Sequence, residues 1–507
     1  MKTILRVLSI GLLLAPTAHS NQTAASLVGP ISLLLDQCNY QQNVVSINGL
    51  TADPETEIAN AGKNSTVQID STFGALSPVN QIVMNECQML LGIGASSPII
   101  QGSVKVAPGG IIDNLTVNGQ GDAPALELDG NGTFEILDSL VTNVDSVMTY
   151  LLTLPGGSNR DFSSAGIIAV GNNPRIHLNN VDATLTGMAV ELWTNGGSAV
   201  VDGGQFTTTG SGDFLNFQIR GSGSFNLLVN GATIESQDNG FVNLQTRENA
   251  SLDVSIINTS IVATDIAVNN MQADDNSKIT AEIMGVDFTS TGDSNVLNNF
   301  QSNDFSTLNL NISDSDFHAT TLSGGFNNFQ ANDNSVYTAV ISGNTTVSSN
   351  ESAAFNSARS NDEAQMSLTI SDSAFSSNGN HGAQAITSAH NSNFTLAIST
   401  SKFTGGTNSS GISQLESRNN SSISAEIYEN DITGDQGALG SNALTNSTLC
   451  VDFKDNTMTS GATFADFGLT QSDSGIFQVV DFSSIEADNN GASVKTAGSI
   501  TDVANCP

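Results

Sequence analysis

The sequence predicts an all-β protein that folds as a single elongated, right-handed parallel β-helix with coils of about 28 residues. The main observation is a short alternation of apolar and polar residues that recurs along most of the 507-residue chain. Successive alternations are 28, 27, 27, 29, 29, 29, 28, 29 and 26 residues apart. Self-similarity at such a period is typical of solenoids, propellers and arrays. The last apolar residue of each alternation marks one repeat: Val201, Val229, Ile256, Ile283, Ile312, Ile341, Ile370, Ile398, Ile427 and Phe453.

Two further landmarks keep the same register. The triplets 216–218, 243–245, 270–272, 299–301 and 328–330 each place an apolar residue between Asn and Gln. Period-2 alternation predicts that this central residue points into the core and that the Asn and Gln face solvent. The second landmark is a large apolar residue five positions after the anchor: Phe206, Ile234, Ile261, Phe288, Phe317, Phe375, Phe403, Ile432 and Met458. After Ile341 this landmark is displaced, with Thr346 at the usual position and Val347 beside it.

Three short strands per repeat, separated by turns rich in Gly, Asn, Ser and Asp, predict one coil of a parallel β-helix. Equivalent residues then stack about 4.8 Å apart, so that Phe and Ile ladders fill the interior and Asn ladders hydrogen-bond. Parallel crossovers are overwhelmingly right-handed, and we expect that hand. The alternative solenoid is a leucine-rich repeat, but its leucine frame is missing and the return segments are poor in helix formers.

The first 20 residues have the pattern of a secretory signal peptide. Lys2 and Arg6 form the charged start, an apolar run extends over 8–15, and Ala18-His19-Ser20 resembles a cleavage site. A membrane anchor is the alternative, but the run is too short to span a bilayer. We therefore expect a secreted, periplasmic or cell-surface protein without membrane insertion.

The remaining chain divides into two caps and a central rod. Residues 21–97 break the repeat and are expected to form an N-terminal cap, with Ile31–Leu35 covering the first coil. We expect the β-helix over residues 98–490 and a C-terminal cap over 491–507. The spacing jumps to 42 residues between Ile136 and Leu178, which predicts an inserted loop near 147–163. Such insertions often lie on a binding face, although this one has apolar residues that could pack back on the rod.

Four cysteines lie outside the main repeats. In an exported chain an even count suggests disulfides. Sequence distance favours Cys38–Cys87 and Cys450–Cys506, each stapling one cap. Buried free thiols are an alternative, and a metal site is disfavoured because no C-x-x-C spacing occurs.

The charge of the chain excludes several classes of partner. It holds 14 Lys and Arg against 49 Asp and Glu, a net charge of −35. Removal of residues 1–20 takes Lys2 and Arg6, which leaves 12 against 49, or −37. That field repels nucleic acid and anionic membranes, and it disfavours polyanionic sugars such as pectate. Solubility of a long rod is the simpler reason for the charge.

Few residues have the spacing of a catalytic or metal-binding group. The histidines after residue 20 are His177, His318, His381 and His390; they fall in different repeats and lack metal-ligand spacing. The pairs Asp274/Asp275 and Asp314/Asp316 have the residue types of a glycoside hydrolase, but both fall where turns are expected. Asp129–Gly132 offers oxygen ligands without the repeats of a calcium-filled roll, so only incidental calcium binding is expected. We expect no cofactor and no dedicated metal site.

The best candidate binding surface is an array of outward amides on five successive coils. It suits an extended or repetitive partner, a glycan or a surface protein. The alternative is that the amide ladders only stabilise the coil stacking. Glycan sites usually add exposed aromatic residues, and the chain has one Trp and four Tyr. The array consists of Asn216, Gln218, Asn243, Gln245, Asn270, Gln272, Asn299, Gln301, Asn328 and Gln330.

By its periodicity, the region 99–485 resembles the right-handed parallel β-helix proteins of the pectate-lyase-like superfamily. Polygalacturonase-like members carry N-T-D, D-D, G-H-G and R-I-K motifs, of which only isolated Asp274-Asp275 and His381-Gly382 occur, in a different context. Phe375-Ser376-Ser377-Asn378 matches the F-x-x-N element of bacterial surface passengers and polymorphic outer-membrane proteins. His381–Ile386 loosely resembles their G-G-A-I element. The end of the chain, 504–507, departs from them because it lacks the aromatic-ended β-barrel that anchors a passenger.

This resemblance implies an exported, non-enzymatic β-helix that serves as an adhesive, structural or partner-binding rod. The alternative is a polysaccharide-active enzyme, a glycoside hydrolase or lyase, with its carboxylates on one face of the same scaffold. Clustered carboxylates and exposed aromatic residues along one groove would favour the enzyme. A polar face with intact amide ladders would favour the rod.

Overall fold

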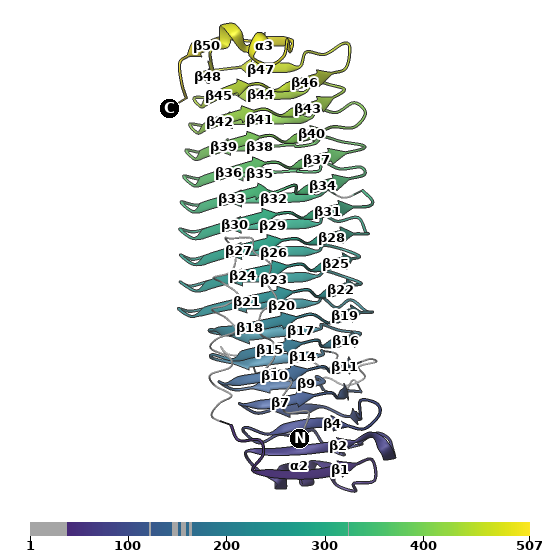
Figure 1. Cartoon of the computed structure of the whole chain (residues 1–507). Helices are drawn as coiled ribbons and strands as arrows, with labels where there is room; N and C mark the ends of the chain where they lie inside the picture. Colours follow the sequence, from purple (N-terminus) through teal and green to yellow (C-terminus); the bar gives the residue numbers. More distant parts are fainter. Residues whose placement is uncertain are drawn as a thin grey trace.

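The computed structural model describes residues 38–120, 123–143, 165–322 and 324–506, together with the backbone of two strands within 151–153 and 159–161. The chain winds into a parallel β-solenoid that rises as a column from the N-terminal to the C-terminal end (Figure 1). From Met89 to Gln471 each coil adds one strand to each of three sheets, here called A, B and C. The predicted signal peptide and the segment Ile31–Leu35 lie outside the described residues.

The three sheets hold nearly all of the described strands, and their bounds are as follows. Sheet A contains β1 (Asn43–Asn48), β2 (Ser65–Asp70), β4 (Met89–Ile93), β7 (Gly110–Asp113), β10 (Thr133–Leu137), β15 (Arg175–Asn179), β18 (Gly197–Asp202), β21 (Ser224–Asn230), β24 (Ser251–Ile257), β27 (Lys278–Met284), β30 (Thr307–Ser313), β33 (Val336–Ser342), β36 (Gln365–Ser371), β39 (Asn393–Ser399), β42 (Ser422–Tyr428), β45 (Thr448–Lys454), β48 (Ile476–Val480) and β50 (Ile500–Val503). Sheet B contains β5 (Ile99–Gln101), β8 (Thr116–Asn118), β11 (Leu140–Asn143), β16 (Asp182–Leu185), β19 (Gln205–Thr208), β22 (Thr233–Ser236), β25 (Ser260–Ala263), β28 (Asp287–Ser290), β31 (Asp316–Ala319), β34 (Thr346–Ser349), β37 (Ala374–Ser377), β40 (Lys402–Thr404), β43 (Asp431–Gly434) and β46 (Thr457–Ser460). Sheet C contains β3 (Ile82–Val83), β6 (Val104–Val106), β9 (Leu126–Asp129), β14 (Ile167–Gly171), β17 (Val190–Thr194), β20 (Leu215–Ile219), β23 (Phe241–Thr246), β26 (Val268–Ala273), β29 (Leu297–Ser302), β32 (Phe326–Ala331), β35 (Ala358–Ser360), β38 (Ile386–Ala389), β41 (Ile412–Arg418), β44 (Leu439–Ala443), β47 (Phe467–Gln471) and β49 (Val494–Ala497).

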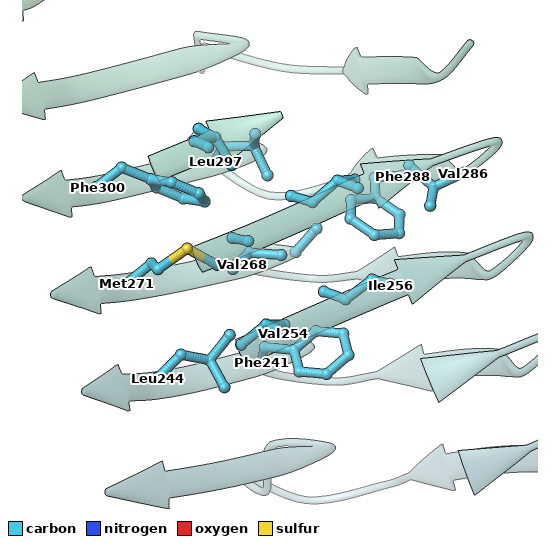
Figure 2. Packing of buried hydrophobic residues seen from close by; sticks show 14 of the residues in the cluster. Phe241, Leu244, Val254, Ile256, Val268, Met271, Val286, Phe288, Leu297 and Phe300 are labelled. Atoms are coloured by element: carbon cyan, nitrogen blue, oxygen red, sulfur yellow. The ribbon is translucent and has the colours of Figure 1, made fainter. Parts of the chain in front are cut away.

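The predicted register is confirmed in all three sheets. In sheet A the anchors pair in succession, for example Ile312 with Ile341 and Ile341 with Ile370. In sheet B, Phe375 pairs with Phe403, and their rings stack at 5.1 Å. The central residues of the Asn–Gln triplets, from Phe217 to Phe329, are fully buried in sheet C. Figure 2 shows how residues from the three sheets meet in the interior. These ladders form because one coil cannot bury its apolar face without the next.

The displaced landmark near Ile341 follows from one extra residue in the turn after β33. Val347, not Thr346, occupies the ladder position, since it pairs with Phe317 on one side and Phe375 on the other. Val347 is 1% exposed, whereas Thr346 points outward. The turn thus absorbs the insertion, and the core ladder stays continuous.

Asparagine ladders also occur inside the solenoid, as expected. Asn430 donates to the Asn456 side chain at 3.0 Å, and Asn456 donates to Asn489 at 2.8 Å. Each amide also donates to a backbone carbonyl, Asn430 to Ile398 and Asn489 to Phe453. All three are buried, so this column satisfies turn carbonyls that water does not reach. It ends beside η3 (Phe482–Ser484) and α3 (Ile485–Asp488), which close the C-terminal end.

Disulfides staple the solenoid near both ends, with the predicted pairing. Cys38 is bonded to Cys87 and Cys450 to Cys506. The helix α2 (Pro54–Ala61) packs against β1, β2 and β3 and buries Ile58 completely. A short 3-10 turn, η2 (Ser71–Phe73), follows β2. The stack already begins at β1, so its first coils lie within the range 21–97 that was expected to form the cap.

The predicted insertion contains two short strands, β12 (Leu151–Thr153) and β13 (Asn159–Asp161). They pair with each other in antiparallel fashion and belong to none of the three solenoid sheets. The side chains of the predicted loop 147–163 lie outside the described residues. The chain re-enters the solenoid at β14, whose neighbours in sheet C are β9 and β17.

Candidate binding face

The ten predicted amides all lie on sheet C, whose labels run down the middle of Figure 1. They come from β20, β23, β26, β29 and β32, one Asn and one Gln from each strand. We call this set of ten residues the amide face. Most of its members are half-buried rather than fully exposed, and Asn216 is only 2% exposed.

A repeated bulge determines how the asparagines of the amide face lie. Asn243, Asn270, Asn299 and Asn328 have φ between 55° and 63°, in the left-handed region that Asn tolerates better than most residues. The register skips each of them, since Asn269 pairs with Asn298 and Met271 pairs with Phe300. The residue before the bulge therefore stays half-exposed on the same side as the bulge residue.

Two parallel asparagine ladders result from this bulge. In the predicted ladder, Asn299 donates to Asn270 at 2.9 Å and Asn328 donates to Asn299. The second ladder was missed from the sequence: Asn298 donates to Asn269 at 3.2 Å, and Asn327 donates to Asn298 at 3.0 Å. The repeated Asn-Asn dipeptides were the available signal. The ladders support a role in coil stacking, but each rung uses only one N–H of an amide that carries two.

The glutamine column is less engaged than the asparagine ladders. Gln245 donates to Gln272 at 3.4 Å, and Gln330 donates to Asn328. Among the described residues the Gln301 side chain has no hydrogen-bond partner. Gln301 is half-buried, and its amide atoms are not among the fully buried polar atoms of the described structure, so a ligand could bond to this amide without loss of internal bonding.

A buried carboxylate lies at the N-terminal end of the amide face. Glu191 of β17 is 3% exposed and accepts from Trp193 Nε1 at 2.8 Å and from Asn216 Nδ2 at 3.2 Å. The Trp193 ring packs with the outward side chains of Ile168 and Val170 in a small apolar cluster separate from the core. Glu191 was not predicted from the sequence, because Asn216, which bonds to it, comes from the next coil.

A second polar group continues along sheet C toward the N-terminus. Lys105 forms ion pairs with Glu127 at 2.9 Å and with Asp129 at 2.6 Å. Glu127 also accepts from Gln81 Nε2 at 3.1 Å and is 3% exposed. Asp129 was predicted as a source of oxygen ligands for a metal ion, but in the structure its carboxylate pairs with the Lys105 ammonium. Within the described parts of the chain, no group of three or more His, Cys, Asp or Glu side chains is arranged to hold a metal ion.

The predicted carboxylate pairs are separated by their local structure. Asp274 follows β26, is 8% exposed, and accepts from Gln272 at 3.0 Å and from Asn303 at 2.8 Å. Its neighbour Asp275 lies in the next turn with φ of 54°. Arg247 approaches Asp274 to 3.5 Å. Asp274 therefore joins the polar network beside the amide face, which gives it a structural role.

The second pair divides between a turn and a strand. Asp314 has φ of 49° in the turn between sheets A and B, whereas Asp316 begins β31 and accepts from the Thr346 hydroxyl. His318 Nδ1 bonds with Ser348 Oγ at 2.7 Å, and His381 Nδ1 accepts from Ser410 N at 2.9 Å. The expectation that each histidine lies in a different coil is wrong for His381 and His390, because they precede and follow β38 of one coil. Burial lowers the pKa of His381.

Near the C-terminal end, sheet C has a shallow depression. Its lining includes Gly440 and Gly468, which pair with each other in the adjacent strands β44 and β47. Phe464, which is 49% exposed, Gln436 and Lys495 also line this depression. This depression was not predicted, because isolated glycines in a strand do not reveal that they are neighbours.

No protein-family model, curated protein or solved structure matches this chain. No helix among the described residues is long and apolar enough to cross a membrane. The two disulfides indicate an oxidising compartment. Any functional assignment therefore depends on the geometry of the solenoid itself.

Proposed function

We propose that this protein is an exported, non-enzymatic rod that binds an extended, hydroxyl-rich polymer, a polysaccharide, along the amide face. The observation that carries the proposal is the repeated amide column with spare hydrogen-bonding capacity. Equivalent side chains recur at about 4.8 Å along the rod, which gives a regular line of donors and acceptors. A sugar polymer presents hydroxyls at regular intervals and can bond to many rungs at once.

Charge also favours an uncharged polymer over an acidic one. The net charge of −35 repels polyanions, and the amide face itself is neutral. Binding would then depend on many weak hydrogen bonds, each of about 0.5–1.5 kcal/mol net. Because these bonds form on one rigid scaffold, their sum can exceed the affinity of any single sugar.

Two further points belong to the same proposal. The location, secreted, periplasmic or at the cell surface, is supported by the disulfides and by the pattern of residues 1–20. Membership of the pectate-lyase-like superfamily, with right-handed winding, is supported by the parallel three-sheet coil. An adhesive rod of this kind needs no catalytic carboxylates, and the predicted Asp pairs are held in turns and internal networks.

A binding screen with a matched pair of variants tests the function. The mature protein would be applied to a glycan array and to insoluble neutral polysaccharides, with and without calcium. Gln301→Ala removes an amide that has no internal partner, so stability should be unchanged while polysaccharide binding weakens severalfold. Asn311→Ala is the control, because Asn311 is an exposed amide on sheet A.

The outcomes separate the possible functions. Release of soluble sugar would contradict the non-enzymatic proposal and favour a hydrolase or lyase. Absence of binding to every polysaccharide, or equal binding by both variants, would leave the amide ladders a purely structural role. Binding to a surface protein instead of a glycan would overturn the polymer class while keeping the rod.

A further inference from the structure

A polar column on the outer face of sheet C links the second asparagine ladder to the depression near the C-terminal end. Asn356 donates to Asn327 at 3.0 Å and so adds a rung to this ladder. Isolated bridges and the pairing of β41 with β44 carry the same register across the next coils. The last members pair directly with each other in β44, β47 and β49. From the ladder to the end of the sheet, the column consists of Asn356, Gln384, Ser413, Gly440, Gly468 and Lys495.

The depression lies where two successive positions of this column carry no side chain. Gly440 and Gly468 pair with each other, and the hollow that they help to line has a volume of about 210 Å³. The turns before β44 and β47 supply Gln436 and Phe464, and β49 supplies Lys495. Residues of successive coils thus form the depression, and the polar column leads to it from the N-terminal side.

The packing of β47 does not require glycine at position 468. A Cβ on Gly468 would meet only the Leu439 carbonyl oxygen, at 3.8 Å, which is an ordinary contact. Its φ is not in the left-handed region either. Gly440 is different, because a Cβ there would lie 2.7 Å from the Ser413 carbonyl oxygen. Glycine weakens a strand and often marks a place where a ligand approaches the backbone. The glycine at 468 therefore keeps the depression open without a steric need of the fold.

The side chains around the hollow have unused bonding capacity. The Phe464 ring is 49% exposed and lies outside the main hydrophobic core. Gln436 and Lys495 are both exposed. Within the described parts of the chain, the Gln436 amide has no hydrogen-bond partner and the Lys495 ammonium has no ion-pair partner. A ligand can therefore bond to both groups without breaking a bond inside the protein.

This combination of groups fits a sugar ring. One face of a pyranose consists largely of C–H groups, which pack on an aromatic ring, and its rim carries hydroxyls that both donate and accept. An apolar surface with a few convergent polar groups is the usual composition of a small-molecule site. An anionic ligand is disfavoured, because Asp435 and Asp466 lie in the same two turns as Gln436 and Phe464.

We propose that the depression binds one unit of a neutral sugar, with the C–H face of the ring on Phe464 and its hydroxyls bonded to Gln436 and Lys495. This inference rests on the proposed function, since it adds a sugar subsite on the path of the same polymer. From β32, the last strand of the amide face, to β44 is four strand steps, or about 19 Å. One polymer chain can then follow the polar column and occupy both places.

Filling the hollow tests the proposal. Gly468→Val places a β-branched side chain there, which suits a strand and meets no close atom at its Cβ. The free energy of unfolding in urea should therefore stay the same or rise. Isothermal titration calorimetry measures the binding of cellohexaose, laminarihexaose, mannohexaose and xylohexaose to the mature protein. At least one of these neutral hexasaccharides should bind, and Gly468→Val should weaken that binding by about tenfold or more.

Removal of the aromatic ring is the second test. Phe464→Ala should weaken binding of the same hexasaccharide by about tenfold, because the C–H face of the sugar loses its packing surface. Phe73→Ala is the matched control. Phe73 is 52% exposed and follows β2 at the opposite end of the solenoid (Figure 1), so its removal should leave the affinity unchanged.

The outcomes separate this inference from the proposed function. Unchanged hexasaccharide affinity in Gly468→Val or in Phe464→Ala, or no binding of any hexasaccharide, would overturn the depression as a sugar site. If Gln301→Ala still weakens polysaccharide binding in that case, the proposed function stands without the depression. The opposite result, with hexasaccharide binding lost in Gly468→Val but equal polysaccharide binding by Gln301→Ala and Asn311→Ala, would keep the depression and remove the amide face.

Discussion

Replacement of Tyr337 by phenylalanine should make the protein more stable. Tyr337 belongs to β33 and is fully buried in the sheet A ladder between Leu308 and Met366. Its hydroxyl has no hydrogen-bond partner in the described structure, and burial raises its pKa well above the usual value. The ring itself packs well, with the Phe329 ring centroid at 6.1 Å. The unfavourable part of burying Tyr337 is therefore the desolvation of its hydroxyl oxygen.

The size of the effect follows from that single atom. A buried polar group without a partner costs about 1–3 kcal/mol relative to water, and Tyr337→Phe removes the group while keeping the ring. The loss of one oxygen leaves only a small gap, so we expect a net gain of about 1–2 kcal/mol in the free energy of unfolding. The sign of the change in the free energy of unfolding is the decisive result, because most core substitutions destabilise a protein.

Urea unfolding followed by circular dichroism measures the change, with Tyr40→Phe as the matched control. The Tyr40 hydroxyl donates to the Gly109 carbonyl at 2.8 Å, so its removal should lower the free energy of unfolding by about 0.5–1.5 kcal/mol. The same chemical change should thus have opposite signs at two sites. A loss of stability in Tyr337→Phe would refute the reasoning, because it would show that the buried hydroxyl is bonded.

Three further predictions concern the pH dependence, the core register and the disulfides. Burial raises the pKa of Glu135 from 4.5 to about 7, so between these pH values the folded state holds a proton that the unfolded state has lost. The free energy of unfolding should therefore fall by up to about 3 kcal/mol as pH rises through this range. Glu135→Gln should remove most of this fall, as measured by urea unfolding at pH 5 and pH 8. Ile370→Asp places an unpaired charge between Ile341 and Ile398 and should cost several kcal/mol or shorten the rod, whereas an unchanged melting temperature would show that the assigned register is wrong. Reduction of the disulfides, which close loops of 49 and 56 residues, should lower the free energy of unfolding by about 4 kcal/mol for each bond, and equal unfolding curves with and without reductant would contradict this.

Much of the interior could be predicted from the sequence. The anchors such as Ile370 repeat at a nearly constant spacing, and an alternation of period two fixes which side chains point inward. When the same pattern recurs in every coil, each buried residue finds its equivalent above and below it. The disulfide pairing followed for a related reason, since the two cysteines of each pair lie near the same end of a nearly one-dimensional molecule.

The candidate site was predicted less completely. The sequence placed the amides on one strand of the repeat, but it did not show that Asn270 and Asn299 adopt a left-handed bulge. That bulge brings the Asn269 and Asn298 column to the same face, and it is stabilised by bonds between coils. Asn216 was predicted to face solvent, and this was wrong: it is 2% exposed and donates to the buried carboxylate of Glu191 in the preceding coil.

The sequence by itself determined the repeat, the inward faces and the covalent staples, because these depend on residue order within one coil. The tertiary structure alone decided what lies on the outside of the coils. Asn216 and Asn243 occupy the same position of the repeat, yet Asn216 is 2% exposed and donates to Glu191 of the preceding coil, whereas Asn243 is half-buried. The burial of Asn216, like the depression at Gly440 and Gly468, arises only when strands from separate coils become neighbours. Contacts between coils depend on stacking, and no single repeat contains that information.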